Sequence, residues 1–386
     1  MLPLASSSWD DAEIGALQSV IESGHFTMGR RVSEFEAAFA TFHGARHAIM
    51  VNSGSSANLI MLSAINYCQD LRSVVGGEVI VPAVSWSTSY YPINQVGARI
   101  RLVDVDTETL NVSVDSVAEA ISSETRAILA VNLLGNPAPL EGLASLAQAN
   151  NLVLLEDNCE SLGASIDGQM TGTFGLASTA SSYFSHHIST MEGGILLTDY
   201  APLAETAWSL RSHGWTRGLP ANNSVHDLSG DDWEDLFRFV LPGYNLRPIE
   251  MEGAVGLMQL AKLNAFVQKR RENAAHWKKV MADLRGFRTQ REHGTSSWFG
   301  FSVLLEDQLA GRRREIVATL AAAGIETRPI VAGNIARNPV MKHLSVVEPA
   351  ALPGADLIHD SGFFIGNHHY DIRKELDRVA EVLSRF

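Results

Sequence analysis

The sequence has only two cysteines, Cys68 and Cys159, in 386 residues. Two thiols cannot form a disulfide scaffold, and they cannot supply the four ligands of an iron–sulfur cluster held by cysteine. A reducing compartment is therefore expected, and we predict a cytoplasmic protein. The sequence also lacks a basic, apolar leader and an uninterrupted apolar run of about eighteen residues, so neither a secretory signal nor a membrane span is expected.

Basic residues are also few. The chain has 30 Lys and Arg against 43 Asp and Glu, which gives a formal net charge of -13. Nucleic acids and anionic membranes bind surfaces with clustered Lys and Arg, so this balance argues against both as partners. A small anionic ligand is still compatible with it, because a few local donors can bind a phosphate on an acidic protein.

Strand-like apolar runs alternate with helical patterns over the first two-thirds of the chain. This alternation predicts an α/β fold with a mostly parallel sheet. The predicted strands lie at residues 48–52, 78–82, 99–105, 127–133, 152–156, 179–184 and 194–197. The predicted helices between them lie at residues 56–66, 115–121, 140–149 and 203–213.

A longer helical pattern over residues 248–271, one helix or two, marks the expected hinge between two domains. We predict a large domain at residues 1–255 and a smaller α+β domain at residues 256–386. The smaller domain should hold strands at 298–305 and 325–329 and helices at 312–323 and 372–384. The polar segment 219–239 predicts a loop, either over a site or simply exposed.

A glycine-containing turn follows the first predicted strand and precedes a helix. Gly54 permits a tight turn there, and the free N–H groups of a helix start can hold a phosphate. The hydroxyls of Ser55 and Ser56 would add donors. An ordinary N-cap turn explains most such segments, and this one matches neither a Walker loop nor a dinucleotide fingerprint.

Two other strand ends carry side chains suited to a flat heteroaromatic ligand. Trp86 could stack on such a ring. The carboxylate of Asp157 could keep a pyridine nitrogen protonated, and Glu160 could reach a phenolic oxygen. A packed tryptophan and an acid-rich helix start are the plainer interpretations of these residues.

The segment that begins at Ser181 contains two adjacent histidines, His186 and His187. Neighbouring side chains on extended backbone point to opposite faces. No suitably spaced Cys, His or carboxylate accompanies them, so no metal site is expected. Either histidine alone would be interpreted as a surface or core residue.

Taken together, these segments resemble the DegT/DnrJ/EryC1/StrS family of sugar aminotransferases and dehydratases over almost the entire chain. They occur in the family's order, together with residues 242–248 and 366–368. The resemblance implies the aspartate aminotransferase-like fold type I of enzymes that bind pyridoxal 5′-phosphate (PLP), and a homodimer with sites completed across the subunit boundary. It assigns Ser181 to the cofactor phosphate and Asn245 to the phosphate of the neighbouring subunit's cofactor.

The family's Schiff-base lysine corresponds to His186 when the chain is counted back from Gly193 and Gly194. Histidine at this position resembles the 3-dehydratases of deoxysugar biosynthesis. The resemblance implies that His186 is a base in the removal of the C3 hydroxyl from a GDP-linked 4-keto-6-deoxy sugar. L-Glutamate would be the amino donor through pyridoxamine 5′-phosphate (PMP), with release of 2-oxoglutarate and ammonia and without an iron–sulfur cluster. His213 is a further candidate for sugar contact.

Three alternatives stay open at this stage. The first is a PMP-dependent aminotransferase that places nitrogen on a 4-keto sugar, against which the missing lysine speaks. The second is a non-catalytic homologue that has lost its lysine, although Trp86, Asp157 and Ser181 are present. The third is a metal-dependent hydrolase that uses His186 and His187.

Overall fold

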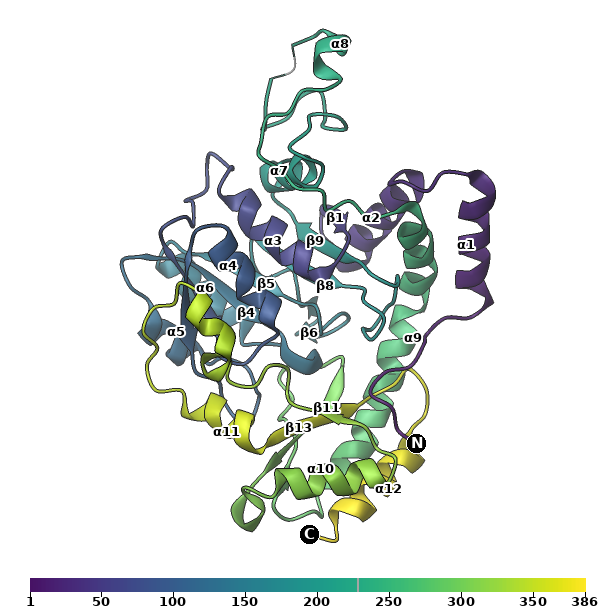
Figure 1. The fold of residues 1–386 in the computed structure, drawn as a ribbon, viewed down its shortest axis with the longest axis vertical. Helices are drawn as coiled ribbons and strands as arrows, with labels where there is room; N and C mark the ends of the chain where they lie inside the picture. Colours follow the sequence, from purple (N-terminus) through teal and green to yellow (C-terminus); the bar gives the residue numbers. More distant parts are fainter. Residues whose placement is uncertain (228) are drawn as a thin grey trace.

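A seven-stranded sheet forms the centre of the larger part of the molecule (Figure 1). The computed structural model describes residues 1–227 and 229–386. The strand order is β1-β9-β8-β5-β4-β2-β3, and only β9 runs antiparallel to its neighbours. The strands are β1 (His47–Val51), β2 (Glu78–Pro82), β3 (Arg99–Val103), β4 (Thr125–Val131), β5 (Val153–Asp157), β8 (Ala177–Ser181) and β9 (Gly194–Thr198). The predicted α/β fold with a mostly parallel sheet is confirmed.

Helices follow most of these strands, as expected for parallel connections. They are α3 (Gly54–Ile65), α4 (Tyr91–Gln95), α5 (Val114–Ala120), α6 (Leu140–Ala149) and α7 (Ala201–Arg211). Strand β2 and helix α6 have the predicted bounds, whereas β8 ends at Ser181 rather than at residue 184. The two-residue strands β6 (Ser165–Ile166) and β7 (Gln169–Met170) pair as a separate hairpin.

A single helix, α9 (Glu250–Met281), occupies the region where one or two were predicted. Helices α1 (Asp11–Ser23) and α2 (Arg30–His43), which the sequence pattern did not reveal, pack beside it (Figure 1). Apolar side chains of α2 form a core cluster with α9 that includes Phe35, Phe39 and Leu263. Although α9 has 32 residues, neither it nor any other helix of the described chain is long and apolar enough to cross a membrane.

A second apolar core is built around Trp277, Trp298 and Phe301. Its antiparallel sheet has the order β10-β11-β13-β12. The predicted boundary at residue 255 falls inside α9, which continues into this core, and the division into two domains therefore stays our proposal. The elements are β10 (Phe287–Arg288), β11 (Gly300–Leu305), α10 (Arg313–Ala322), β12 (Thr327–Arg328), α11 (Pro353–Ser361), β13 (Gly362–Gly366) and α12 (Arg373–Leu383).

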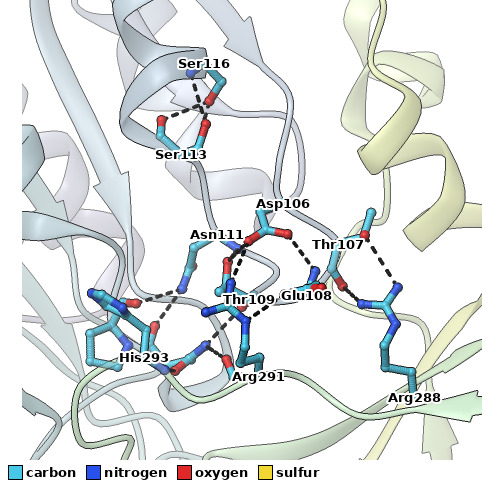
Figure 2. A network of polar contacts seen from close by, with 12 residues as sticks. Asp106, Thr107, Glu108, Thr109, Asn111, Ser113, Ser116, Arg288, Arg291 and His293 are labelled. Carbon is cyan, nitrogen blue, oxygen red and sulfur yellow. Dashed lines mark hydrogen bonds and ion pairs between the residues drawn. The ribbon is translucent and has the colours of Figure 1, made fainter.

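A polar junction joins the loop after β3 to the segment between β10 and β11 (Figure 2). Arg291 forms an ion pair with Glu108 at 2.7 Å, and its backbone N–H donates to the carbonyl of the same residue. Arg288 donates to the carbonyl of Thr107 at 2.7 Å. The loop follows β3 of the large sheet, Arg288 ends β10 of the second sheet, and Arg291 follows it. These contacts therefore connect the two sheets.

Residues 213–227 and 229–245 form an arm that projects from the body of the molecule and carries the short helix α8 (Asp232–Asp235) at its tip (Figure 1). Gly214 has a positive φ of 80°, and a Cβ there would lie 1.7 Å from the carbonyl oxygen of Leu241, so the two sides of the arm meet at a glycine. The ring of Trp215 stacks on Phe237 and Phe239. The described part of the predicted loop, residues 219–227 and 229–239, lies in this arm, and residue 228 lies outside the described residues.

One buried ion pair ties α7 to β1 and α2. Arg211, which is 1% exposed, donates to Glu36 at 2.5 Å and to the carbonyl of Met50 at 2.6 Å. The carboxylate of Glu36 also accepts from the N–H of Met50 at 2.7 Å. Loss of one partner would leave the other charge buried and unpaired.

Substitution Arg211→Met should therefore lower the free energy of unfolding by about 3–5 kcal/mol. The matched control, Arg385→Met, removes an exposed pair with Glu381 and should change it by less than about 1 kcal/mol. Denaturant unfolding followed by circular dichroism measures both. Equal effects of the two substitutions would contradict the assignment of Arg211 as a buried structural cation.

Candidate functional site

The carboxylate of Asp157 is held rigidly at the end of β5. Its Oδ2 accepts from the hydroxyl of Ser89 at 2.7 Å and from the side-chain amide of Asn58 at 2.9 Å. Asn58 is oriented in turn by Thr179, whose hydroxyl donates to it at 2.6 Å. The other oxygen, Oδ1, accepts from the N–H of Cys159 at 3.3 Å and from no other donor among the described residues. A carboxylate fixed in this way can accept from the N–H of a pyridinium ring.

The predicted phosphate loop and Ser181 come together in the structure. A Cβ at Gly54 would lie 2.7 Å from the Cβ of Ser181 and 3.2 Å from Sγ of Cys159, so only glycine fits at the start of α3. Ser53 caps this helix by accepting from the N–H of Ser56 at 3.1 Å. The first turn of α3 and the Ser181 hydroxyl therefore converge in the manner that an anion requires.

The two serines of this turn differ in their availability. Ser56 donates its hydroxyl to Asn52 at 2.6 Å and accepts from Ser53 at 3.0 Å, so it stabilises the turn. Ser55 is exposed, and within the described residues its hydroxyl makes a single hydrogen bond, to Thr88 at 3.0 Å. Of the two predicted phosphate contacts, Ser55 has the freer hydroxyl.

Trp86 lies in the connection that follows β2, immediately before the short 3-10 helix η1 (Ser87–Ser89). Its side chain is 59% exposed, unusual for a residue so large. The same short helix delivers Ser89 to Asp157. The exposed indole and the serine that holds the carboxylate of Asp157 are therefore carried three residues apart by one segment, as a stacked and hydrogen-bonded ring would require.

His186 lies in the loop between β8 and β9, and its ring packs against Phe299 at 5.3 Å between centroids. Its Nδ1 is buried and has no hydrogen-bond partner in the described structure. Burial, followed by the positive charge of Arg270, lowers the pKa of His186 to about 4. The imidazole is thus neutral near pH 7, with a ring nitrogen able to accept a proton.

His187 has a different environment from its neighbour. It is 2% exposed, and its Nε2 donates to the carbonyl of Ser297 at 3.2 Å. Burial and Arg270 hold its pKa well below the usual value. No three His, Cys, Asp or Glu side chains are arranged to hold a metal ion in residues 1–227 and 229–386.

Glu160 is linked to the His186 loop through Leu134 and Phe299. It accepts from the N–H of Leu134 at 2.9 Å, and the carbonyl of Leu134 accepts from the N–H of Phe299 at 3.1 Å. Phe299 is the residue against which His186 packs. Burial and the nearby charge of Asp157 raise the pKa of Glu160 to about 7, so its carboxyl can exchange a proton near neutral pH.

Asn245 and His213 are both exposed at the base of the arm. Asn245 accepts from Arg247 at 3.1 Å, and the backbone N–H of His213 donates to the carbonyl of Tyr244 at 2.6 Å. Neither side chain hydrogen-bonds to the residues described above within the part of one chain that the structure covers. Their predicted roles at a cofactor or sugar stay predictions.

Sequence reasoning missed the partners that orient these groups. Asn58 and Ser89 hold Asp157, Phe299 packs on His186, and Arg270 lowers its pKa. Asn58 falls within the segment that the motif covered, so its position on the first helical turn offered a signal. Nothing in the local sequence around Phe299 or Arg270 indicates proximity to residue 186.

Comparison with known proteins agrees with this geometry. The model of the DegT/DnrJ/EryC1/StrS aminotransferase family matches residues 7–384. GDP-4-keto-6-deoxy-D-mannose 3-dehydratase of Escherichia coli O55:H7 is 46% identical over 384 residues, with 99% of each chain covered.

Two solved structures extend the comparison. One is GDP-4-keto-6-deoxymannose-3-dehydratase with a trapped PLP-glutamate geminal diamine, and the other is a histidine-to-asparagine mutant of that enzyme with bound GDP-perosamine. Each has a TM-score of 0.97 and 45% identity, and each alignment covers 99% of this chain and 100% of the other. The chain belongs to the DegT/DnrJ/EryC1/StrS aminotransferase family.

Proposed function

We propose that this protein removes the C3 hydroxyl of GDP-4-keto-6-deoxy-D-mannose, a nucleotide-linked 4-keto-6-deoxy sugar. The cofactor is PLP, used as PMP, and L-glutamate is the amino donor. The observation that carries the proposal is a neutral histidine, His186, with an unpartnered Nδ1 at the position of the family's lysine. The 3-dehydratase relatives, at 45–46% identity over 99% of this chain, support the substrate class.

The described residues fit such a cofactor. Gly54 lets the first turn of α3 pack directly against Ser181, where a Cβ would clash. The exposed indole of Trp86 suits stacking on a pyridine ring, and the fixed carboxylate of Asp157 suits a hydrogen bond to the ring nitrogen. When bound, the cofactor supplies an electron sink and, as PMP, an amino group. Ser55 and Ser181 would donate to its phosphate, and Asp157 would hold a proton at its ring nitrogen.

His186 then acts in proton transfer. Its neutral imidazole can accept a proton at a ring nitrogen and return it to the C3 oxygen as that oxygen leaves. Histidine cannot form the stable covalent link that lysine makes with the cofactor, which favours loss of oxygen over a complete transamination cycle. In the balanced reaction, sugar and L-glutamate give the 3-deoxy sugar, 2-oxoglutarate and ammonia.

The test is an assay with PLP, L-glutamate and enzymatically generated GDP-4-keto-6-deoxy-D-mannose. We expect one ammonia and one 2-oxoglutarate for each sugar that loses one oxygen in mass. His186→Asn should bind PMP like the unmodified protein and lose dehydration by about 100-fold or more, because a general base is removed. An amino sugar without ammonia would instead establish an aminotransferase, and full activity of the variant would rule out His186 as the base.

The lowered pKa of His186 also predicts how the rate of dehydration depends on pH. Since the pKa of His186 is lowered to about 4, the unprotonated base persists at pH 5–8 and is lost only as the pH falls through about 4. Single-turnover rates with preformed PMP enzyme, measured in Glu160→Gln to remove the carboxyl whose pKa is about 7, should therefore show no acid limb between pH 5.5 and 7, where an unperturbed histidine would titrate at about 6.5. An acid limb near pH 6.5 would contradict the assigned environment.

We further propose a homodimer in which Asn245 completes the neighbouring subunit's site. The exposed position of Asn245, together with the exposed rings of Trp86, Tyr183 and Phe184, supports a surface covered by a second copy. Sedimentation should give about twice the chain mass of 41.9 kDa.

Co-expressed His186→Asn and Asn245→Ala chains test the sharing of sites. If Asn245 acts across the boundary, the mixed dimer has one intact site, and activity should return to about a quarter of normal. If it acts within its own subunit, the mixed dimer has none and the activity stays lost.

A further inference from the structure

The N-terminal segment 2–9, called the strap below, runs from the second core to the loop that carries His186. At its start, Leu2 is buried among the residues of the second core and pairs with Ile325. His368 then holds the strap twice, through a 2.8 Å hydrogen bond with Ser6 and through the carbonyl of Pro3 at 3.0 Å. Figure 1 shows the strap passing along α9 before α1 begins.

The far end of the strap meets the His186 loop at Ser189. The indole N–H of Trp9 donates to the carbonyl of Ser189 at 3.0 Å, and the N–H of Ser189 donates to Oε1 of Gln259 at 3.0 Å. Ser189 is 3% exposed. Both backbone polar groups of one buried residue are therefore bound by side chains that are remote in the sequence.

The side-chain amide of Gln259 connects the strap to the loop, and all of its hydrogen-bonding positions are occupied. It is completely buried, and Oε1 accepts from the hydroxyl of Ser8 at 2.6 Å as well as from Ser189. Its Nε2 donates to the carbonyl of Ser8 at 3.2 Å and to Glu13 at 2.8 Å. A buried amide with both donors and both acceptor positions engaged has one orientation, so it fixes the groups that it binds.

A charged contact holds this arrangement on α9. Lys262, one turn beyond Gln259, bonds to Glu13 at 2.7 Å and to Asp10 at 2.8 Å. Glu13 is itself completely buried. The residues that follow the strap are therefore anchored to the same helix that supplies Gln259.

The imidazole of His186 depends on this backbone for its position. Its Nδ1 has no hydrogen-bond partner, and its ring touches Phe299 and Tyr183 through aromatic contacts. On the N-terminal side, the N–H of His186 donates to the carbonyl of Tyr183 at 2.9 Å. On the C-terminal side, the chain is restrained by the side chain of His187, by the buried side chain of Ile188 in the core cluster with α9, and by the two bonds at Ser189.

We propose that the strap, through Trp9 and together with Gln259, is a positioning device that holds the His186 loop in its reactive geometry. The inference rests on the proposed role of His186 as a base. A base must lie within hydrogen-bond reach of the proton it takes, and a displacement of about 1 Å can lower a rate by about 100-fold. Trp9 and Gln259 touch neither cofactor nor sugar in this scheme and act through Ser189.

Two substitutions test the device. Trp9→Phe removes one N–H while keeping an aromatic ring, and Gln259→Met removes the amide while keeping its length. Each should lower kcat for dehydration by about tenfold or more, with the KM for the sugar and the affinity for PMP unchanged. Gln268→Met, an exposed position on the same helix, is the matched control and should leave kcat unchanged.

A second comparison separates positioning from general damage. In a His186→Asn background, Trp9→Phe and Gln259→Met should cause no additional loss of the residual rate, because the group that they position is gone. An equal additional loss in that background, or an unchanged kcat in both single variants, would overturn the proposal. The melting temperature of Trp9→Phe should stay close to that of the unmodified protein, which would show that a lower kcat in this variant does not come from misfolding.

Hydrogen exchange of the cofactor-free protein gives a readout that does not require activity. Peptides that contain residues 186–190 should exchange faster in Gln259→Met than in Gln268→Met, because the N–H of Ser189 loses its acceptor. Unchanged exchange would overturn the restraint. If the unmodified protein leaves the sugar intact while the exchange difference is present, the proposed dehydration fails and the restraint on the loop is still supported.

Discussion

The fixed carboxylate of Asp157 is the constraint from which the rest of the site is arranged. It is buried at the carboxyl end of β5, where Ser89 and Asn58 both donate to one of its oxygens. A buried carboxylate is stable only when such donors surround it. The donors come from the connection after β2 and from α3, so the same bonds bring Trp86 and the phosphate turn to one edge of the sheet.

The proposed proton transfer depends on a histidine, His186, that is kept neutral. Burial and the positive charge of Arg270 lower the pKa of His186. The ring of Phe299, which packs against the imidazole, offers it no hydrogen-bond donor. A lysine in this loop would bond covalently to an aldehyde cofactor, whereas in the proposed mechanism a neutral imidazole leaves the cofactor free and moves protons. The proposed division between dehydration and transamination therefore follows from one side chain and its environment.

Sequence patterns predicted the sheet well, because strands buried on both faces are short, continuous apolar runs. They missed α1, α2 and β13, whose burial depends on partners from distant parts of the chain. The motif residues Gly54, Asp157 and Ser181 could be found because each ends or begins a strand–helix unit. The orienting partners could not, since contacts such as Phe299 with His186 join residues more than a hundred positions apart.

The sequence by itself determined the α/β class, the acidic composition, the motif residues and the histidine in place of lysine, because these are properties of residue type and local order. Only the tertiary structure decided that Ser56 stabilises its own turn while Ser55 is freer. It also decided that Nδ1 of both histidines is buried without a partner among the described residues, while Nε2 of His187 bonds to the carbonyl of Ser297. Hydrogen-bond partners and burial set these differences, and both depend on segments that the chain brings together only when it folds.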